Sequence, residues 1–162
     1  MDSKRRPGLE REAPNTHLIL ILTPIIFVIF WVLDSFVFQW TTVLNNLVPS
    51  IIRIILFIAF IIVALYLIYT SHNTLFQNDE PADKLITSGI LNHIRNPMYL
   101  GILLIYVALI CLSMSLISIG VLVAIFFLYN WMVNFEEEKL EGLFGEDFIK
   151  YKENVGKWFP KS

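Results

Sequence analysis

Two short polar stretches flank an apolar hairpin in this chain, and their side chains are of the types that bind charged small molecules. The first stretch covers 85–101 and contains Arg95, Asn96 and Tyr99, and the second opens with the carboxylate run 136–138. Carboxylates bind cationic and diol groups, whereas a guanidinium binds a carboxylate bidentately. Such residues at the end of a helix bundle predict a site for a polar cofactor and a lipid-like substrate.

Each of these features also has a purely structural interpretation. Arg95 alone is a common kind of interfacial anchor. Asn96 and Pro97 together fit a helix start, with Asn96 as the N-cap. A run such as 136–138 usually faces water. The functional interpretation therefore depends on both stretches occurring together, on either side of a hairpin.

Composition places the chain in a membrane. Its 162 residues are 56% hydrophobic and 16% charged, and the mean hydropathy is +0.66. A single domain of this length cannot bury so much apolar surface, so lipid must cover part of it. The one cysteine, Cys111, excludes an intrachain disulfide and a cysteine-based metal cluster. The three histidines have no i, i+4 spacing, and no metal site is predicted.

The apolar runs predict an all-α, polytopic integral membrane protein with about four transmembrane helices and a C-terminal helical hairpin. An interfacial C-terminal helix should follow, because apolar residues recur there at helical spacing. The spanning helices are expected at about 17–39, 48–70, 97–112 and 116–134, and the interfacial helix at about 138–154.

The expected division of the chain has three parts. These are a polar N-terminal tail at 1–16, two transmembrane helices at 17–71 and a core at 72–162 that contains both polar stretches.

The distribution of basic residues predicts the orientation. With four spanning helices, eleven of the twelve lysines and arginines fall on one side, and only Arg53 falls on the other. The positive-inside rule then places both termini and both polar stretches in the cytoplasm. Asp34 and Arg53 are interpreted as residues near the interface that snorkel, rather than as catalytic groups.

Taken together, the two stretches resemble the membrane methyltransferases of the isoprenylcysteine carboxyl methyltransferase type, which include phospholipid methyltransferase-like relatives. The family pattern has Arg-His-Pro-x-Tyr-x-Gly, then a helical hairpin, then Glu-Glu-x-x-Leu-x-x-x-Phe-Gly. The resemblance covers about 84–160, and it implies that 72–162 is a cofactor-binding methyltransferase core. The matching residues are Leu85, Gly89, Arg95, Pro97, Tyr99, Gly101, Glu136, Glu137, Leu140, Phe144, Gly145, Tyr151 and Val155.

Three positions depart from the family pattern. Leu91 and Phe148 stand where the family has tyrosines, and Asn96 stands where it has the histidine of the cofactor site. Asparagine still donates and accepts hydrogen bonds, so cofactor binding can survive the change. Altered affinity, altered substrate preference and loss of activity are the alternatives.

The resemblance implies S-adenosylmethionine as cofactor and methyl transfer by one in-line displacement in a water-poor pocket. The implied acceptor is lipid-like, either a prenylcysteine-type carboxylate or a phospholipid amine, and for an amine Glu137 is a candidate proton acceptor. Arg95 and Glu137 are the expected catalytic residues, and Glu137→Gln and Arg95→Ala should each greatly reduce methyl transfer while leaving expression intact. The residues expected to bind the cofactor are Leu85, Gly89, Ile90, Leu91, Ile94, Arg95, Asn96, Pro97, Tyr99, Glu136 and Glu137.

Two other functions compete with this one. Nicotinamide-dependent, sterol-type membrane reductases share a similar hairpin, but many have an acidic residue where this chain has Ile102. A catalytically inactive membrane module of the same fold would explain the three departures. Retention of Arg95, Tyr99 and both glutamates favours the methyltransferase. The expected partners are the lipid bilayer and a lipid-like or prenylated small molecule, with no nucleic acid.

Overall fold

A computed structural model describes residues 13–76 and 85–161 of the chain. Most of the tail predicted at 1–16, and the residues 77–84 of the connecting segment, lie outside this range. The described residues form helices joined by short turns, without a β-strand. In chain order these are α1 (Thr16–Val32), the π-helical η1 (Leu33–Phe38), the 3-10 turn η2 (Val43–Asn46), α2 (Ser50–Phe76), the 3-10 turn η3 (Gly89–Asn92), α3 (Pro97–Ser113), α4 (Leu116–Phe144) and α5 (Glu146–Asn154).

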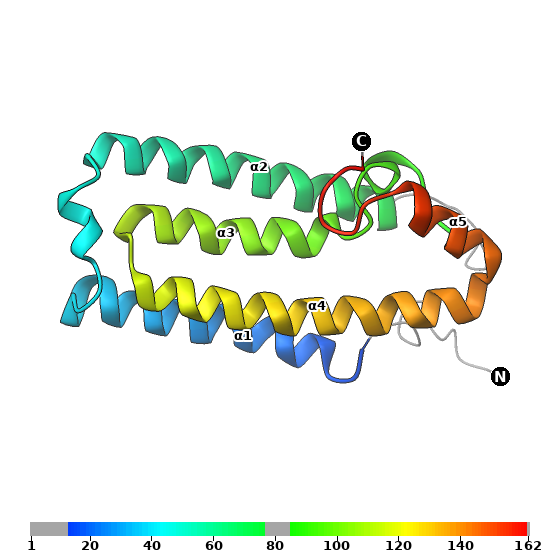
Figure 1. Ribbon diagram of the computed structural model, residues 1–162, viewed down its shortest axis with the longest axis horizontal. Helices are drawn as coiled ribbons and strands as arrows, with labels where there is room; N and C mark the ends of the chain where they lie inside the picture. The colour runs from blue at the N-terminus through cyan, green and yellow to red at the C-terminus, as the bar shows by residue number, and fades with distance from the viewer. Residues whose placement is uncertain (1–12, 77–84, 162) are drawn as a thin grey trace.

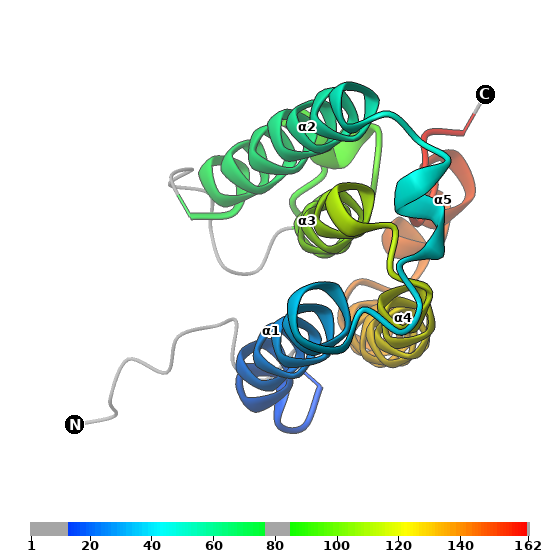
Figure 2. The same ribbon diagram turned by 90° about the vertical axis from the view of Figure 1, so that its left-hand side faces the viewer.

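The four long helices lie side by side along the longest axis of the molecule (Figure 1). They form two pairs, α2 with α3 and α1 with α4, as Figure 2 shows from one end. The first pair is the closer one, because a Cβ on Gly101 would lie 2.7 Å from Ile68 Cγ1 and 3.0 Å from the Ala64 carbonyl oxygen. A small residue at a helix crossing lets two backbones approach within the membrane. The glycine of the family motif therefore sets the contact between α2 and α3.

Aromatic rings fill the space between the two pairs. Phe27 of α1 stacks on Tyr106 of α3, with their ring centroids 4.5 Å apart. Tyr129 of α4 is fully buried, and its hydroxyl lies 2.6 Å from the Thr23 hydroxyl of α1. This hydrogen bond satisfies a phenol that would otherwise be unpaired in an apolar interior.

The outer surfaces of these helices are apolar and must face lipid. Three segments are long and apolar enough to span a membrane, at Thr16–Phe38, Ser50–Leu75 and Leu116–Phe144. The fourth, α3, has 17 residues and a length of about 26 Å, slightly less than the hydrocarbon core. The predicted class, an all-α multi-pass membrane protein, is confirmed.

The boundary between the fourth helix and the predicted interfacial helix is wrong. The sequence predicts a break near residues 134–138, whereas α4 continues without interruption to Phe144. Glutamate, lysine and leucine are good helix formers, so nothing in 135–141 stops the helix. The break comes at Gly145, whose φ of +53° is in the left-handed region that favours glycine.

The interpretation of Asp34 and Arg53 as snorkelling residues is also wrong. Asp34 is 2% exposed and accepts hydrogen bonds from the Thr41 backbone N–H at 3.0 Å and the Ser115 hydroxyl at 2.5 Å. Arg53 donates to the Leu112 carbonyl at 2.7 Å. Both side chains therefore tie the loop between α1 and α2 to the turn between α3 and α4. This network lies at the end of the bundle opposite the two polar stretches (Figure 1).

Candidate functional site

A buried ion pair joins the two polar stretches at one end of the bundle. Arg95 Nε donates to Glu137 Oε1 at 3.0 Å, and Arg95 Nη2 donates to Glu137 Oε2 at 3.2 Å. Each side chain is only 8% exposed. Two parallel hydrogen bonds of this kind fix the orientation of both groups. The pair links the segment just before α3 to the C-terminal third of α4, as the sequence predicted for two stretches returning to one end.

Arg95 also holds the C-terminal segment, defined here as residues 155–159, which follows α5. Its Nη1 donates to the carbonyl oxygens of Lys152 at 2.9 Å and Val155 at 2.6 Å. Its backbone N–H donates to the Gly156 carbonyl at 2.9 Å, and Ile94 and Gly156 form an isolated parallel bridge. One arginine therefore connects the start of α3, α4 and the C-terminal segment.

Asn96 does not act as the side-chain cap that its position suggests. It precedes α3 as the N-cap residue, but its side chain makes no capping hydrogen bond. Instead, Nδ2 donates to Glu137 Oε1 at 3.2 Å and to the Lys157 carbonyl at 3.4 Å. Asn96, which stands at the position of the family histidine, therefore still donates a hydrogen bond to Glu137.

The neighbouring carboxylate, that of Glu136, is held by the hydroxyl group of a tyrosine. Tyr99 donates to Glu136 Oε1 at 2.7 Å, and its ring lies edge-on to Tyr129 with centroids 5.6 Å apart. A carboxylate beside aromatic rings is suited to a cationic group, because both the negative charge and the ring faces attract it.

The remaining predicted residues lie around η3 and pack in two directions. Leu91 and Ile94 are buried, and the Leu91 carbonyl accepts a hydrogen bond from the Tyr151 hydroxyl at 2.6 Å. Gly89 has φ +58° and faces α2, where a Cβ would lie 2.8 Å from Thr74 Oγ1. Leu85 and Ile90 are half-buried and make no hydrogen bond to either carboxylate in the described part of the chain. The predicted set is thus brought to one end, but its first residues pack nearer to α2 than to the glutamates.

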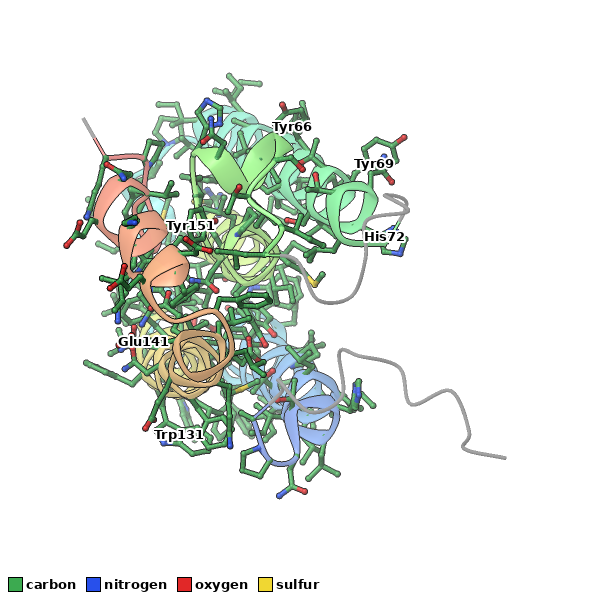
Figure 3. The ribbon with its side chains drawn as sticks, turned by 90° about the vertical axis from the view of Figure 1, so that its right-hand side faces the viewer. Tyr66, Tyr69, His72, Trp131, Glu141 and Tyr151 are labelled. Atoms are coloured by element: carbon green, nitrogen blue, oxygen red, sulfur yellow. The ribbon has the colours of Figure 1, made fainter. Side chains whose placement is uncertain are left out.

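Tyr151 joins α5 to this end of the bundle. Figure 3, which views the molecule from this end, shows Tyr151 on the inner side of α5, whereas Tyr69 projects outward from α2. Burial, helped by the nearby negative charge of Glu137, raises the pKa of Tyr151 to about 12, against the opposing effect of Arg95.

The raised pKa of Tyr151 makes stability depend on pH in a defined window. Between its ordinary value of 10.0 and about 12, the folded protein keeps the phenol proton while the unfolded chain loses it, so stability falls as pH rises. Tyr151→Phe should be about 1 kcal/mol less stable at neutral pH, having lost one hydrogen bond. Its stability should fall less steeply than the wild type between pH 10 and 12. Tyr69→Phe, at an exposed position, is the control, and an identical slope for Tyr151→Phe and wild type would contradict the assignment.

A row of polar side chains on α4, which was not predicted from the sequence, also lies at this end of the bundle. Asn130 and Asn134 each place their Oδ1 atom 2.6 Å from the Lys157 ammonium. The Trp158 indole N–H also donates to Asn130 Oδ1, at 3.3 Å. The spacing 130, 134 and 137 repeats every three or four residues, and the two asparagines stand in the mostly apolar first part of α4. This pattern is the signal that could have revealed the row.

An apolar groove lies between α3 and α4, next to this polar row. It has a volume of about 310 Å³, and its exposed lining is wholly apolar. The side chains that line it come from α3, α4 and the C-terminal segment, and they are Leu100, Leu103, Leu104, Val107, Leu122, Val123, Phe126, Trp158 and Phe159. The C-terminal segment thus separates the polar cluster from the groove.

The structure is thus that of a multi-pass membrane protein in which a cluster of buried charges lies beside an apolar groove. The family profile of phospholipid methyltransferases matches residues 47–147 of the chain. This match covers more than half of the chain, which therefore belongs to the phospholipid methyltransferase family and is a membrane methyltransferase. The resemblance seen in the sequence is confirmed. A comparison with curated proteins finds no significant match.

Proposed function

We propose that the protein transfers a methyl group from S-adenosylmethionine to a lipid-like acceptor at the polar end of the bundle. The observation that carries this proposal is the pair of adjacent carboxylates, Glu136 and Glu137, held by Tyr99 and Arg95 at one end of the helix bundle. When bound, the cofactor supplies an activated methyl group on a positively charged sulfur. The residues present fit such a ligand, because they offer carboxylates and aromatic rings to a cation and a diol.

The geometry divides the roles of the predicted residues. Glu136 with Tyr99 is assigned to the cofactor, because a carboxylate can accept hydrogen bonds from a diol or an amino group. Glu137 already accepts from Arg95 and Asn96. Arg95 and Glu137 are therefore assigned a positioning role, which keeps the C-terminal segment against α3 and α4. This assignment differs from the catalytic role expected from the sequence.

The acceptor is a prenylcysteine-type carboxylate or a phospholipid amine. A carboxylate is ionised at neutral pH and needs no base, whereas an amine must release a proton. The orientation proposed from the sequence remains the positive-inside one. Six of the seven described lysines and arginines lie at the polar end, and only Arg53 lies at the other, so this end is assigned to the cytoplasm.

Titration calorimetry of the detergent-solubilised protein with S-adenosylhomocysteine tests the cofactor site. The wild type should bind with micromolar affinity. Glu136→Gln should weaken binding roughly tenfold or more, because it removes a charged partner of the cofactor. Glu137→Gln should also weaken binding, because Arg95 loses the carboxylate that orients it. Glu138→Gln, an exposed neighbour on the same helix, is the matched control and should bind like wild type. Absence of binding by folded wild type, or binding of a reduced nicotinamide instead, would refute the proposal.

A further inference from the structure

Three buried hydroxyl groups, on Tyr106, Tyr129 and Thr23, form a row that joins α3, α4 and α1. The exposed fractions of these residues are 2%, 0% and 5%. The Tyr129 oxygen lies 2.6 Å from the Thr23 oxygen and 3.4 Å from the Tyr106 oxygen. The Thr23 hydroxyl donates to the Ile19 carbonyl at 2.9 Å. Because a hydroxyl group carries one proton, Tyr129 must donate to Thr23 and accept from Tyr106. This hydroxyl row therefore holds Tyr129 from two sides.

The ring of Tyr129 in turn contacts Tyr99, which holds Glu136. The Tyr99 and Tyr129 rings lie edge to face, with their centroids 5.6 Å apart and their planes at 60°. Tyr129 and Glu136 are seven residues apart on α4, about two helical turns, so they lie on the same face of that helix. Tyr99 thus meets this face twice, at Tyr129 through its ring and at Glu136 through its hydroxyl.

The two contacts of Tyr99 determine different parts of its conformation. The hydrogen bond to Glu136, at 2.7 Å, fixes the position of the hydroxyl but leaves the plane of the ring undetermined. The edge-to-face contact with Tyr129 fixes that plane. Such a contact contributes a free energy that corresponds to roughly two- to tenfold in an equilibrium constant. Without the Tyr129 ring, other rotamers of Tyr99 become accessible, and Glu136 is held less tightly.

Part of the support for Tyr129 comes from a helix outside the segment that matches the family profile. α1 ends before residue 47, where that match begins. α1 supplies Thr23 to the hydroxyl row, and it also supplies Phe27, whose ring stacks on Tyr106 with centroids 4.5 Å apart. Hydrogen bonds between helices inside a membrane help to fix their relative positions. Family membership therefore leaves this part of the arrangement undetermined.

From this arrangement we infer that Tyr129 is a positioning residue of the cofactor site and that α1 anchors it through Thr23. The inference rests on the proposed methyltransferase function, because that function assigns Glu136 to the cofactor. Tyr129 touches no ligand in this role. It holds the ring of Tyr99, and Tyr99 directs the Glu136 carboxylate toward the cofactor. A helix outside the matched segment thereby contributes to the affinity of the site.

S-adenosylhomocysteine titration of two Tyr129 variants separates positioning from a merely structural role. Tyr129→Phe keeps the ring and should weaken binding less than about threefold, whereas Tyr129→Leu removes the ring and should weaken it roughly tenfold. Both variants lose the hydrogen bond to Thr23 and should unfold at a lower temperature than wild type. The conservative variant should therefore rescue binding without rescuing stability. Equal losses of affinity in the two variants, or no loss in Tyr129→Leu, would overturn the inference.

A double variant tests the anchoring by α1. Thr23→Val keeps the size of the side chain but removes the acceptor of the Tyr129 hydroxyl, and it should weaken binding about two- to threefold. Added to Tyr129→Leu, the same substitution should cause no further loss, because Thr23 acts through Tyr129. Additive losses would contradict the anchoring. Tyr66→Leu, which removes an exposed ring from α2, is the matched control and should bind like wild type.

A measurement without cofactor separates this inference from the proposed function. Tyr99 is replaced by 3-fluorotyrosine, and its fluorine resonance is recorded in the ligand-free protein. Because an aromatic ring shifts the resonances of its neighbours, Tyr129→Leu should move this resonance and Tyr66→Leu should not. Glu136→Gln should move it in wild type and much less in combination with Tyr129→Leu. Absence of these shifts would contradict the inference. Folded wild type that shows them but binds no S-adenosylhomocysteine would refute the cofactor proposal while supporting the role of Tyr129 in orienting Tyr99.

Discussion

Replacing Arg95 by methionine is expected to abolish most of the methyl transfer and to destabilise the protein by about 3 kcal/mol or more, the usual effect of leaving one charge of a buried pair without its partner. The side chain removed makes two hydrogen bonds to Glu137 and two to backbone carbonyls near the end of α5. Methionine fills a similar space but replaces none of these bonds. The effect is measured as the free energy of unfolding in detergent, together with kcat and KM.

A double variant separates the loss of charge balance from the loss of positioning. Arg95→Met combined with Glu137→Leu removes both charges, and an apolar pair of similar size is often nearly neutral for stability. We expect the double variant to recover much of the stability lost in Arg95→Met. Methyl transfer should stay roughly a hundredfold below wild type, because the C-terminal segment is no longer held in place. Full recovery of activity in the double variant would show that the pair acts only through stability.

Gly156→Ala is the second variant with a large expected effect. A Cβ at this position would lie 1.7 Å from the carbonyl oxygen of Phe159, a distance that only a backbone shift can relieve. The Gly156 carbonyl accepts from the Arg95 N–H, so such a shift would also move the residue that orients Glu137. We expect a loss of stability of about 1–3 kcal/mol, as for other overpacked interior sites, and clearly weaker S-adenosylhomocysteine binding.

Gly142→Ala is the matched control for this substitution. Gly142 lies in α4 at the same end of the molecule, and a Cβ there would meet nothing within 4 Å. Alanine favours a helix over glycine, so the control should be up to about 1 kcal/mol more stable than wild type. Both variants are compared by thermal unfolding in the same detergent. Equal stability of Gly156→Ala and Gly142→Ala would mean that the C-terminal segment does not pack as described.

The class of fold and the general location of the site were predictable from local properties of the chain. Long apolar runs must become helices in lipid, because only a helix satisfies its own backbone hydrogen bonds there. The short turn between α3 and α4 then returns the chain to its starting side. Arg95 and Glu137 could therefore be placed at one end without knowing any contact between them.

Helix ends were less predictable, for a physical reason that α4 illustrates. The change from apolar to charged residues near 135 marks where the chain leaves the hydrocarbon, but it wrongly predicts the end of a helix there. Helix formation depends instead on backbone propensity, and the backbone continues to Phe144. Polarity therefore indicated the membrane boundary, while Gly145 determined the helix boundary.

The sequence by itself determined the all-α membrane class, the family, and the pairing of an arginine-containing stretch with two glutamates. Only the tertiary structure decided which groups are partners. Arg95 contacts the backbone near Val155, and Lys157 contacts α4 at Asn130, because α5 turns the chain back after Gly145. Hydropathy and spacing describe which face a residue occupies on its own helix. The partner of that face depends on how distant segments pack, which requires the three-dimensional arrangement of the whole chain.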